Sequence, residues 1–203
     1  MSGGGNGVEQ PDSFEFSPEN IERARKTIAK YPEGRQASAV MPLLDLAQRQ
    51  SGGWLPAAAI EYVADFLNIP PMRAFEVATF YTMYSLKPVG RNRVQVCTTT
   101  PCWLRGSDEV LSACRSKLGI EPGETTADGA FSLDEAECLG ACVNAPLIQV
   151  NDDYYEDLDG ERTEALLDAL GRGERPEPGS QSGRQMSAPE GPRTSLINDP
   201  GKT

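Results

Sequence analysis

The segment VCTTTPCWLRG, residues 96–106, decides how the second half of this chain folds. The residues that lead into it, 93–97, alternate valine with polar residues and predict a strand that ends on Cys97. A helical pattern follows at 107–118, so we expect Cys102 just ahead of a helix. A thiol at the end of a strand and another before the next helix place both cysteines at one edge of a sheet.

The segment ECLGACVNAP, residues 137–146, carries a second close pair of cysteines, Cys138 and Cys142. It follows another predicted strand, at 130–137, and its glycine and alanine allow backbone N–H groups to approach sulfur. The chain has no histidine, so a site for a soft metal must be built from thiolates. We therefore expect two loops at one sheet edge to supply two thiolates each to a single site.

The spacing C-x4-C followed by C-x3-C has three alternatives to an iron–sulfur cluster. A structural zinc usually takes C-x2-4-C pairs, and x4 combined with x3 across about 35 residues is unusual for one. A redox dithiol requires C-x-x-C, which is absent. Four unrelated buried thiols do not explain the pairing. The spacing favours an iron–sulfur cluster, and four ligands on a small domain favour the [2Fe–2S] type, with these candidate ligands: Cys97, Cys102, Cys138 and Cys142.

The fifth cysteine, Cys114, is excluded from the ligands. It shares one face of the predicted helix 107–118 with Val110, Leu111 and Leu118, so we expect a buried hydrophobic side chain. The start of the chain lacks the features of a secretory signal, and a disulfide framework is not expected. We expect a reducing compartment.

Composition limits the function further. The 203 residues carry a net charge of −11, which argues against nucleic acid as a partner because nucleic acid requires a basic face. No apolar run approaches the roughly 20 residues of a spanning helix, so direct membrane insertion is not expected. The chain has no glycine-rich nucleotide motif, so hydride chemistry must belong to a partner.

The organisation along the chain predicts four regions. Apolar residues at helical spacing predict helices at about 17–31, 38–50, 56–67 and 75–84. After residue 90 the predicted order is βα–βββα, with strands at 147–151 and 154–156 and a closing helix at 162–170, which is typical of a thioredoxin-type layer. The regions are a disordered N-terminus at 1–16, a helical bundle at 17–90, a thioredoxin-like domain at 91–171 and an extended tail at 172–203.

Residues 96–106 and 137–146 resemble the two ligand loops of the 24 kDa subunit family of NADH:quinone oxidoreductase. The segments SAVMPLL, 38–44, and VATFYTMY, 77–84, match further signatures of that family. The resemblance covers residues 17–170. It implies an α+β chain, in which an N-terminal helical bundle precedes a thioredoxin-like α/β [2Fe–2S] ferredoxin domain.

The resemblance also implies a function and partners. It implies an electron-transfer subunit of the NADH dehydrogenase module of respiratory complex I, whose cluster exchanges single electrons with FMN. The FMN and NADH would lie on a flavoprotein subunit, with the large iron–sulfur subunit as a second partner. The location would be the peripheral arm, on the cytoplasmic face of the bacterial inner membrane or the matrix side in a mitochondrion. The alternatives are a small subunit of an NAD-linked hydrogenase or formate dehydrogenase, a stand-alone ferredoxin, or a mainly structural subunit that braces the flavoprotein.

Two further features have two interpretations each, and a third concerns the tail. Trp103 could shield the cluster from water or pack in the core. The aromatic residues at 75–84 span more than one helix face, which indicates an interface with a partner or a contact within the chain. The tail at 178–184 and 187–191 resembles that of long-tailed family members, but Arg193 departs from the pattern and leaves its docking open.

Overall fold

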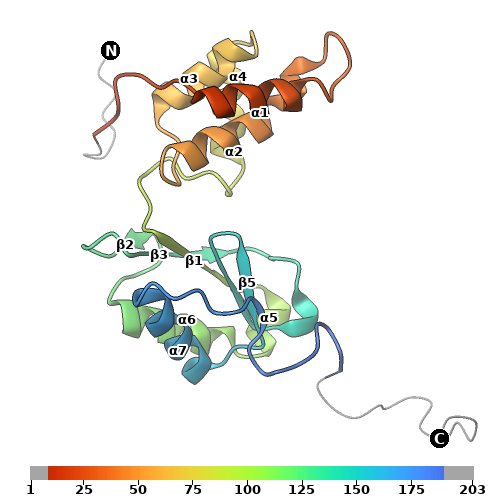
Figure 1. Cartoon of the computed structure of the whole chain (residues 1–203). Helices are drawn as coiled ribbons and strands as arrows, with labels where there is room; N and C mark the ends of the chain where they lie inside the picture. Colours follow the sequence, from red (N-terminus) through yellow and green to blue (C-terminus); the bar gives the residue numbers. More distant parts are fainter. Residues whose placement is uncertain (1–8, 190–203) are drawn as a thin grey trace, which may run out of the picture. The chain divides into compact units, whose positions relative to one another are not determined.

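The computed structural model describes residues 9–189 and divides into two compact units, Met1–Val89 and Gly90–Thr203 (Figure 1). Arg193 lies outside the described residues. Helices make up the first unit. They are α1 (Pro18–Ile28), the 3-10 helix η1 (Gln36–Ala39), α2 (Val40–Gln50), α3 (Ala57–Phe66) and α4 (Pro71–Phe80).

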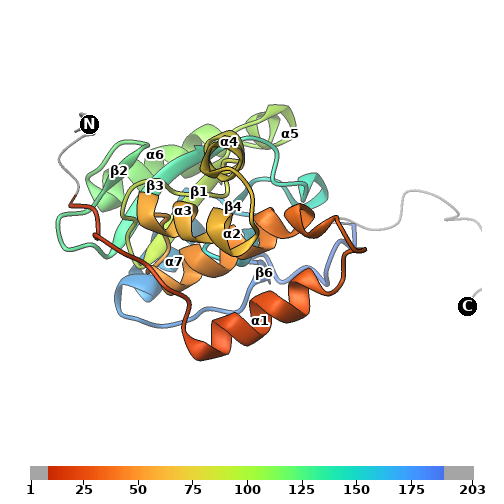
Figure 2. The ribbon, with the colours of Figure 1, turned by 90° about the horizontal axis from the view of Figure 1, so that it is seen from above.

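Helix α1 begins where the sequence predicts it. The side chain of Ser17 accepts a hydrogen bond from the backbone N–H of Asn20, and Pro18 occupies the first turn, where its missing N–H costs nothing. Acidic Glu19 near the start and basic residues in the last turn both suit the helix dipole. The helix lies alongside α2 (Figures 1 and 2).

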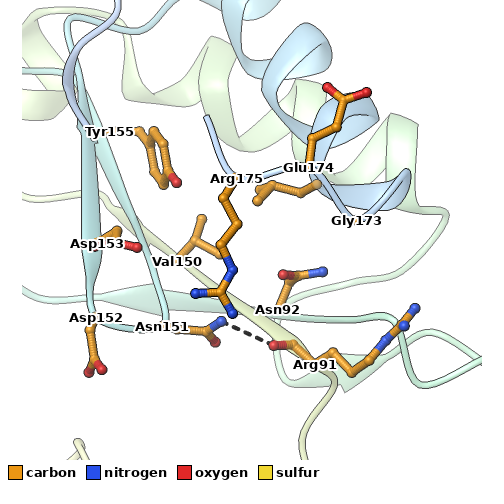
Figure 3. A pocket seen from close by; sticks show the side chains of 11 residues that line it. Arg91, Asn92, Val150, Asn151, Asp152, Asp153, Tyr155, Gly173, Glu174 and Arg175 are labelled. Carbon is orange, nitrogen blue, oxygen red and sulfur yellow. Dashed lines mark hydrogen bonds between the residues drawn. The ribbon is translucent and has the colours of Figure 1, made fainter. Parts of the chain in front are cut away.

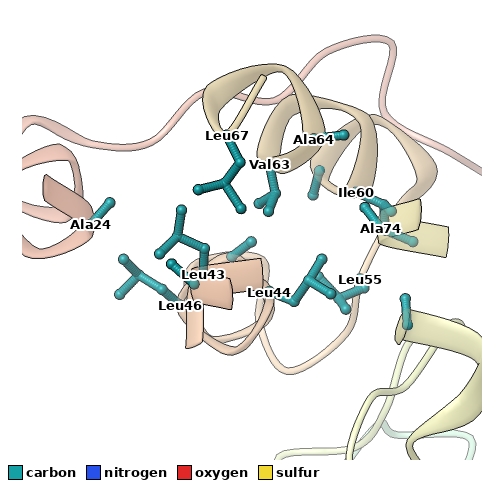
Figure 4. Packing of buried hydrophobic residues seen from close by; sticks show 14 of the residues in the cluster. Ala24, Leu43, Leu44, Leu46, Leu55, Ile60, Val63, Ala64, Leu67 and Ala74 are labelled. Atoms are coloured by element: carbon teal, nitrogen blue, oxygen red, sulfur yellow. The ribbon is translucent and has the colours of Figure 1, made fainter. Parts of the chain in front are cut away.

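The core of the first unit lies between α1, α2 and α3. Leu43 and Leu46 of α2 face Val63 and Leu67 near the end of α3, and Ala24 of α1 borders the same cluster (Figure 4). The helix predicted at 56–67 is confirmed, and the apolar residues at its helical spacing are all buried: Ile60, Val63, Ala64 and Leu67.

The prediction of disorder at residues 1–16 is wrong for Phe14 and Phe16, and its first eight residues lie outside the described part of the chain. Phe16 is buried, and both rings make edge-on contacts with Tyr62, at centroid distances of 5.5 Å for Phe14 and 5.2 Å for Phe16. Phe16 also contacts Phe66. Aromatic burial of this kind stabilises a segment that lacks regular secondary structure.

The helix expected at 75–84 ends earlier, because α4 stops at Phe80 and the backbone of Tyr81 is extended. The change of direction buries Tyr84, whose hydroxyl donates to the carbonyl of Met41 at 2.9 Å. Phe80 and Tyr81 stay exposed, as expected of an interface.

The second unit is built on a six-stranded sheet in the order β2-β3-β1-β4-β5-β6. Strand β1 is central, running parallel to β3 and antiparallel to β4. The strands are β1 (Asn92–Cys97), β2 (Glu124–Thr125), β3 (Phe131–Ala136), β4 (Leu147–Val150), β5 (Asp153–Glu156) and β6 (Gly179–Ser180).

Helices α6 (Ser107–Leu118) and α7 (Gly160–Gly171) pack on each other and lie along the sheet (Figure 1). The core between helices and sheet joins Val96 of β1 and Leu133 of β3 to Val110 of α6 and Leu167 of α7. The sequence pattern predicted both helices and the four longer strands, and the structure confirms them. No helix within residues 9–189 is long and apolar enough to span a bilayer.

Gly90 enters the second unit against the backbone of β3. Its N–H donates to the hydroxyl of Ser132 at 2.7 Å, and a Cβ at Gly90 would lie 2.5 Å from the carbonyl carbon of Phe131. Only glycine allows so close an approach of two backbones.

Replacing Gly90 by alanine should therefore destabilise the second unit by roughly 1–3 kcal/mol, because the added methyl group forces the backbone apart. The matched control is Gly171→Ala, whose Cβ would meet only the ring of Phe131 at 3.8 Å. It should be neutral or stabilising by up to about 1 kcal/mol, since it gains helix propensity. Urea unfolding followed by circular dichroism measures both, and equal stabilities would contradict the steric argument.

Candidate metal centre

The topology of the sheet brings the two cysteine loops together. Because β1 and β3 are parallel, their carboxyl ends lie at the same edge, with Cys97 opposite Ala136 in the register. Cys138 lies two residues after Ala136, in the loop that follows β3. Strand β4 runs in the opposite direction, so its first residue, Leu147, lies at this edge as well.

The first thiol pair is buried. Cys97 ends β1, and Cys102 lies inside a short helix, α5 (Thr100–Leu104), with neither side chain exposed. The sequence predicted Cys102 just ahead of a helix. That order is confirmed, since α6 begins at Ser107, but Cys102 itself lies in a separate short helix, α5, with Pro101 in its first turn.

The second thiol pair lies at the surface. Gly140 has a φ of +85°, which favours glycine, and it turns the chain between the two cysteines. A 3-10 turn, η2 (Cys142–Asn144), follows. The Sγ atoms of Cys138 and Cys142 are 3.6 Å apart, too far for a disulfide and close to the ~3.8 Å expected for two thiolates on one tetrahedral metal with ~2.3 Å bonds.

Hydrogen bonds link the two loops through sulfur. Backbone N–H groups donate to the thiols, from Leu139 to Cys97 and from Leu147 to Cys102. The hydroxyl of Thr99 also lies 3.5 Å from the Sγ of Cys97. Donors of this kind stabilise thiolates and tune the potential of a cluster.

The pKa values of the thiols show that they act on one another. Burial raises the pKa of Cys97, but hydrogen bonds from Thr99, Leu139 and Cys102 outweigh it, and the pKa is lowered. Burial, together with the neighbouring Cys97, raises the pKa of Cys102 to about 12. The hydrogen bond with Cys138 raises the pKa of Cys142, which also responds to Cys97. The two pairs therefore interact electrostatically, through Cys142 with Cys97 and Cys102.

The thiols are arranged as two pairs. No three Cys, Asp or Glu side chains within residues 9–189 converge on a single metal-ion position. A structural zinc needs four ligands around one ion, whereas a binuclear [2Fe–2S] centre needs two thiolates for each iron. The donor set and its pairing fit the cluster.

Two other side chains differ from the four candidate ligands. Cys114 is fully buried in the core of the second unit, as predicted, and burial raises its pKa to about 12. Trp103 is exposed, and its indole N–H donates to Asp108 at 3.0 Å, so the core-packing interpretation is wrong. Tyr154, which the sequence did not single out, donates its hydroxyl to the carbonyl of Leu139 at 2.8 Å and anchors the second loop.

Two hollows in the second unit, of about 390 and 400 Å³, are lined by no cysteine. The first lies near the start of β1, whereas Cys97 is at the end of that strand. Its lining mixes charges, with Arg175 extending toward Asn151 and the side chain of Asn151 donating to the carbonyl of Arg91 at 3.0 Å (Figure 3). It is separate from the thiols.

An exposed apolar group flanks the thiol loops. Trp103 and Leu104 follow Cys102, Val143 follows Cys142, and the carbonyl of Met186 accepts a hydrogen bond from Asn144. These four are the large apolar side chains that stay exposed in the described part of the second unit, and we call them the apolar collar. Exposed apolar groups around a functional site are typical of a docking surface.

The fold and the paired thiols define a small thioredoxin-like module with a thiolate metal centre. The family model for the thioredoxin-like [2Fe-2S] ferredoxin matches residues 24–171. In Rickettsia bellii, the NADH-quinone oxidoreductase subunit designated E is 63% identical over 158 residues, which cover 78% of this chain and 95% of that protein. The mitochondrial NADH dehydrogenase [ubiquinone] flavoprotein 2 of Dictyostelium discoideum is 51% identical over 189 residues, 92% of this chain and 76% of that one.

The chain therefore belongs to the thioredoxin-like [2Fe–2S] ferredoxin family, and within it to the group that contains these NADH-quinone oxidoreductase subunits. Among solved structures, an NAD+-reducing [NiFe]-hydrogenase in the air-oxidized state matches with a TM-score of 0.56 at 23% identity. That match covers 64% of this chain and 23% of the hydrogenase chain, and it shows a shared fold.

Proposed function

We propose that this chain carries single electrons through one [2Fe–2S] cluster, as a subunit of an NADH:quinone oxidoreductase. The observation that carries the proposal is that two loops with a pair of thiols each meet through sulfur, the backbone N–H groups of Leu139 and Leu147 donating to Cys97 and Cys102. Family membership supports the cluster type. Its ligands would be Cys97, Cys102, Cys138 and Cys142.

Two of the four candidate ligands are buried and two are exposed. When bound, the cluster accepts and releases one electron at a time. Cys97 and Cys102 would hold it from the buried side of the site, and Cys138 and Cys142 would hold it from the surface, where a partner can approach. The amides of Leu139 and Leu147 stabilise the inner thiolates.

The partner chemistry follows from what this chain lacks in its sequence. It has no glycine-rich nucleotide motif, so NADH and FMN would lie on a flavoprotein subunit, with the large iron–sulfur subunit as a second neighbour. The names of the Rickettsia relatives, which are subunits of NADH-quinone oxidoreductase, support this assembly. The apolar collar supplies a surface for it. The complex would place this chain in a peripheral arm, on the cytoplasmic or matrix side.

The proposal is tested by anaerobic purification, followed by iron, sulfide and zinc analysis and by EPR of the reduced protein. We expect about two irons and two sulfides per chain and a rhombic low-temperature signal. Zinc in place of iron, or a reduced protein without that signal, would exclude the cluster. A cluster-free variant that still supports NADH oxidation at the full rate in the complex would instead favour a structural subunit.

Leu104→Glu should weaken binding of the flavoprotein subunit by at least about tenfold, because it places a charge in the apolar collar. The EPR signal should stay unchanged, since Leu104 is exposed and contributes no sulfur. The matched control is Met72→Glu, at another exposed apolar residue, in the first unit. Calorimetric titration with the flavoprotein subunit measures both. If Leu104→Glu and the unaltered chain bind the flavoprotein subunit with equal affinity, the apolar collar is not part of the interface.

A further inference from the structure

The described part of the C-terminal tail packs on the loop that carries Cys142. Strand β6 pairs in parallel with β5, and the N–H of Gln181 donates to the carbonyl of Glu156 at 2.9 Å. The tail has no periodic apolar pattern, so polar bonds must attach it.

A buried ion pair is the centre of this attachment. Arg184 pairs with Asp157, and their side chains are only 9% and 5% exposed. The hydroxyl of Ser180 donates to the same carboxylate at 2.6 Å, and that of Ser182 at 3.4 Å. Charges are retained in such a place only when hydrogen bonds compensate for lost water, so the contact requires specific geometry.

Three bonds extend from this pair and its neighbours to the turn that follows Cys142. The guanidinium of Arg184 donates to the carbonyl of Val143 at 3.4 Å. The side-chain amide of Asn144 donates to the carbonyl of Met186 at 2.9 Å. The N–H of Asp157 donates to the carbonyl of Asn144 at 2.8 Å. The turn is thus held by the tail, through Arg184 and Met186, and also by Asp157, which binds the tail.

The exposed thiol pair depends on such support. Cys138 and Cys142 are exposed, and Gly140 between them has open space around it. Of the other loop residues, Leu139 and Ala141 are only partly buried. A ligand must be held in place by its surroundings to bind a metal tightly.

We propose that Arg184 and Asp157 are positioning residues for the metal centre, forming a clamp that fixes the turn 142–144 and with it Cys142. The inference rests on the proposed function, since it takes Cys142 as a cluster ligand. The clamp includes a segment outside the matched family model, which ends at residue 171. It gives the C-terminal tail a role in retaining the cluster.

The test uses the full chain with its cluster and two variants. Arg184→Gln removes the guanidinium but strands the Asp157 carboxylate. The double variant Asp157→Asn/Arg184→Gln removes both charges, so no buried charge is left unpaired, and asparagine tolerates the left-handed backbone at 157. Arg115→Gln is the control, because its pair with Glu121 is exposed. The readouts are the rate of cluster loss to an iron chelator and amide hydrogen exchange at 142–144.

We expect the double variant to lose its cluster about tenfold faster than the unaltered chain, with faster exchange at 142–144 and unchanged protection of β1 and β3. Arg115→Gln should match the unaltered chain. A double variant with unaltered cluster loss and exchange overturns the clamp, even where Arg184→Gln alone unfolds the protein. An unaltered chain without iron and sulfide overturns the proposed function instead, so the two failures are distinguishable.

Discussion

Cys102→Ser or Cys138→Ser should reduce the [2Fe–2S] EPR signal per folded chain by at least about tenfold. A serine hydroxyl keeps its proton at neutral pH and is a poor substitute for a thiolate. Cys102 is buried, so no water-exposed side chain can take its place, and Cys138 lies 3.6 Å from its partner Cys142. One variant from each pair tests both halves of the ligand set.

Cys114→Ala is the matched control. It removes a thiol from the core of the same unit and should cost about 1 kcal/mol of unfolding free energy, from lost burial and a small cavity. The EPR signal and the iron and sulfide content per folded chain should be unchanged. Loss of the signal in Cys114→Ala, or its survival in both serine variants, would contradict the ligand assignment.

Leu43→Ala should destabilise the first unit by roughly 2–5 kcal/mol. Leu43 of α2 is fully buried in the core of this unit, so its truncation leaves a cavity. The two units have separate cores, so β1 and β3 should keep their protection and the EPR signal should persist. Native-state hydrogen exchange measures each unit by itself.

Met72→Ala is the control in the same unit. Met72 is exposed, so its truncation should change stability by no more than about 0.5 kcal/mol. If hydrogen-exchange protection of the sheet falls together with that of α2 and α3 in Leu43→Ala, the two units unfold cooperatively. The division at Val89 would then not separate two units of independent stability.

The elements that the sequence predicted well are those with a complete local pattern. Helix α6 has its apolar face at helical spacing and ends at Gly119 in the left-handed conformation, so both its period and its end were readable. The helix at 75–84 was extended too far because its aromatic pattern continues past Phe80. Tyr84 is buried and donates its hydroxyl to the carbonyl of Met41. This is a contact between residues distant along the chain, and no local pattern contains it.

The same distinction applies to the metal centre. The cysteine spacing and the absence of histidine determined the donor set, since a soft metal here has only thiolates available. The spacing did not show that Cys102 lies in its own short helix, or that Leu147 directs an N–H at its sulfur. It also left the docking of the tail open, because the pair of Arg184 and Asp157 joins residues that are distant along the chain.

By itself, the sequence determined the helical first unit, the strand and helix order of the second, the four candidate ligands and the exclusion of Cys114. These follow from periodicity and composition, which act over a few residues. Only the tertiary structure decided which thiols are buried and which are exposed, and how the two loops meet. Strand β1 pairs in parallel with β3 and antiparallel with β4, which brings one end of each strand to the same edge of the sheet. Such long-range pairing has no signature in the local sequence.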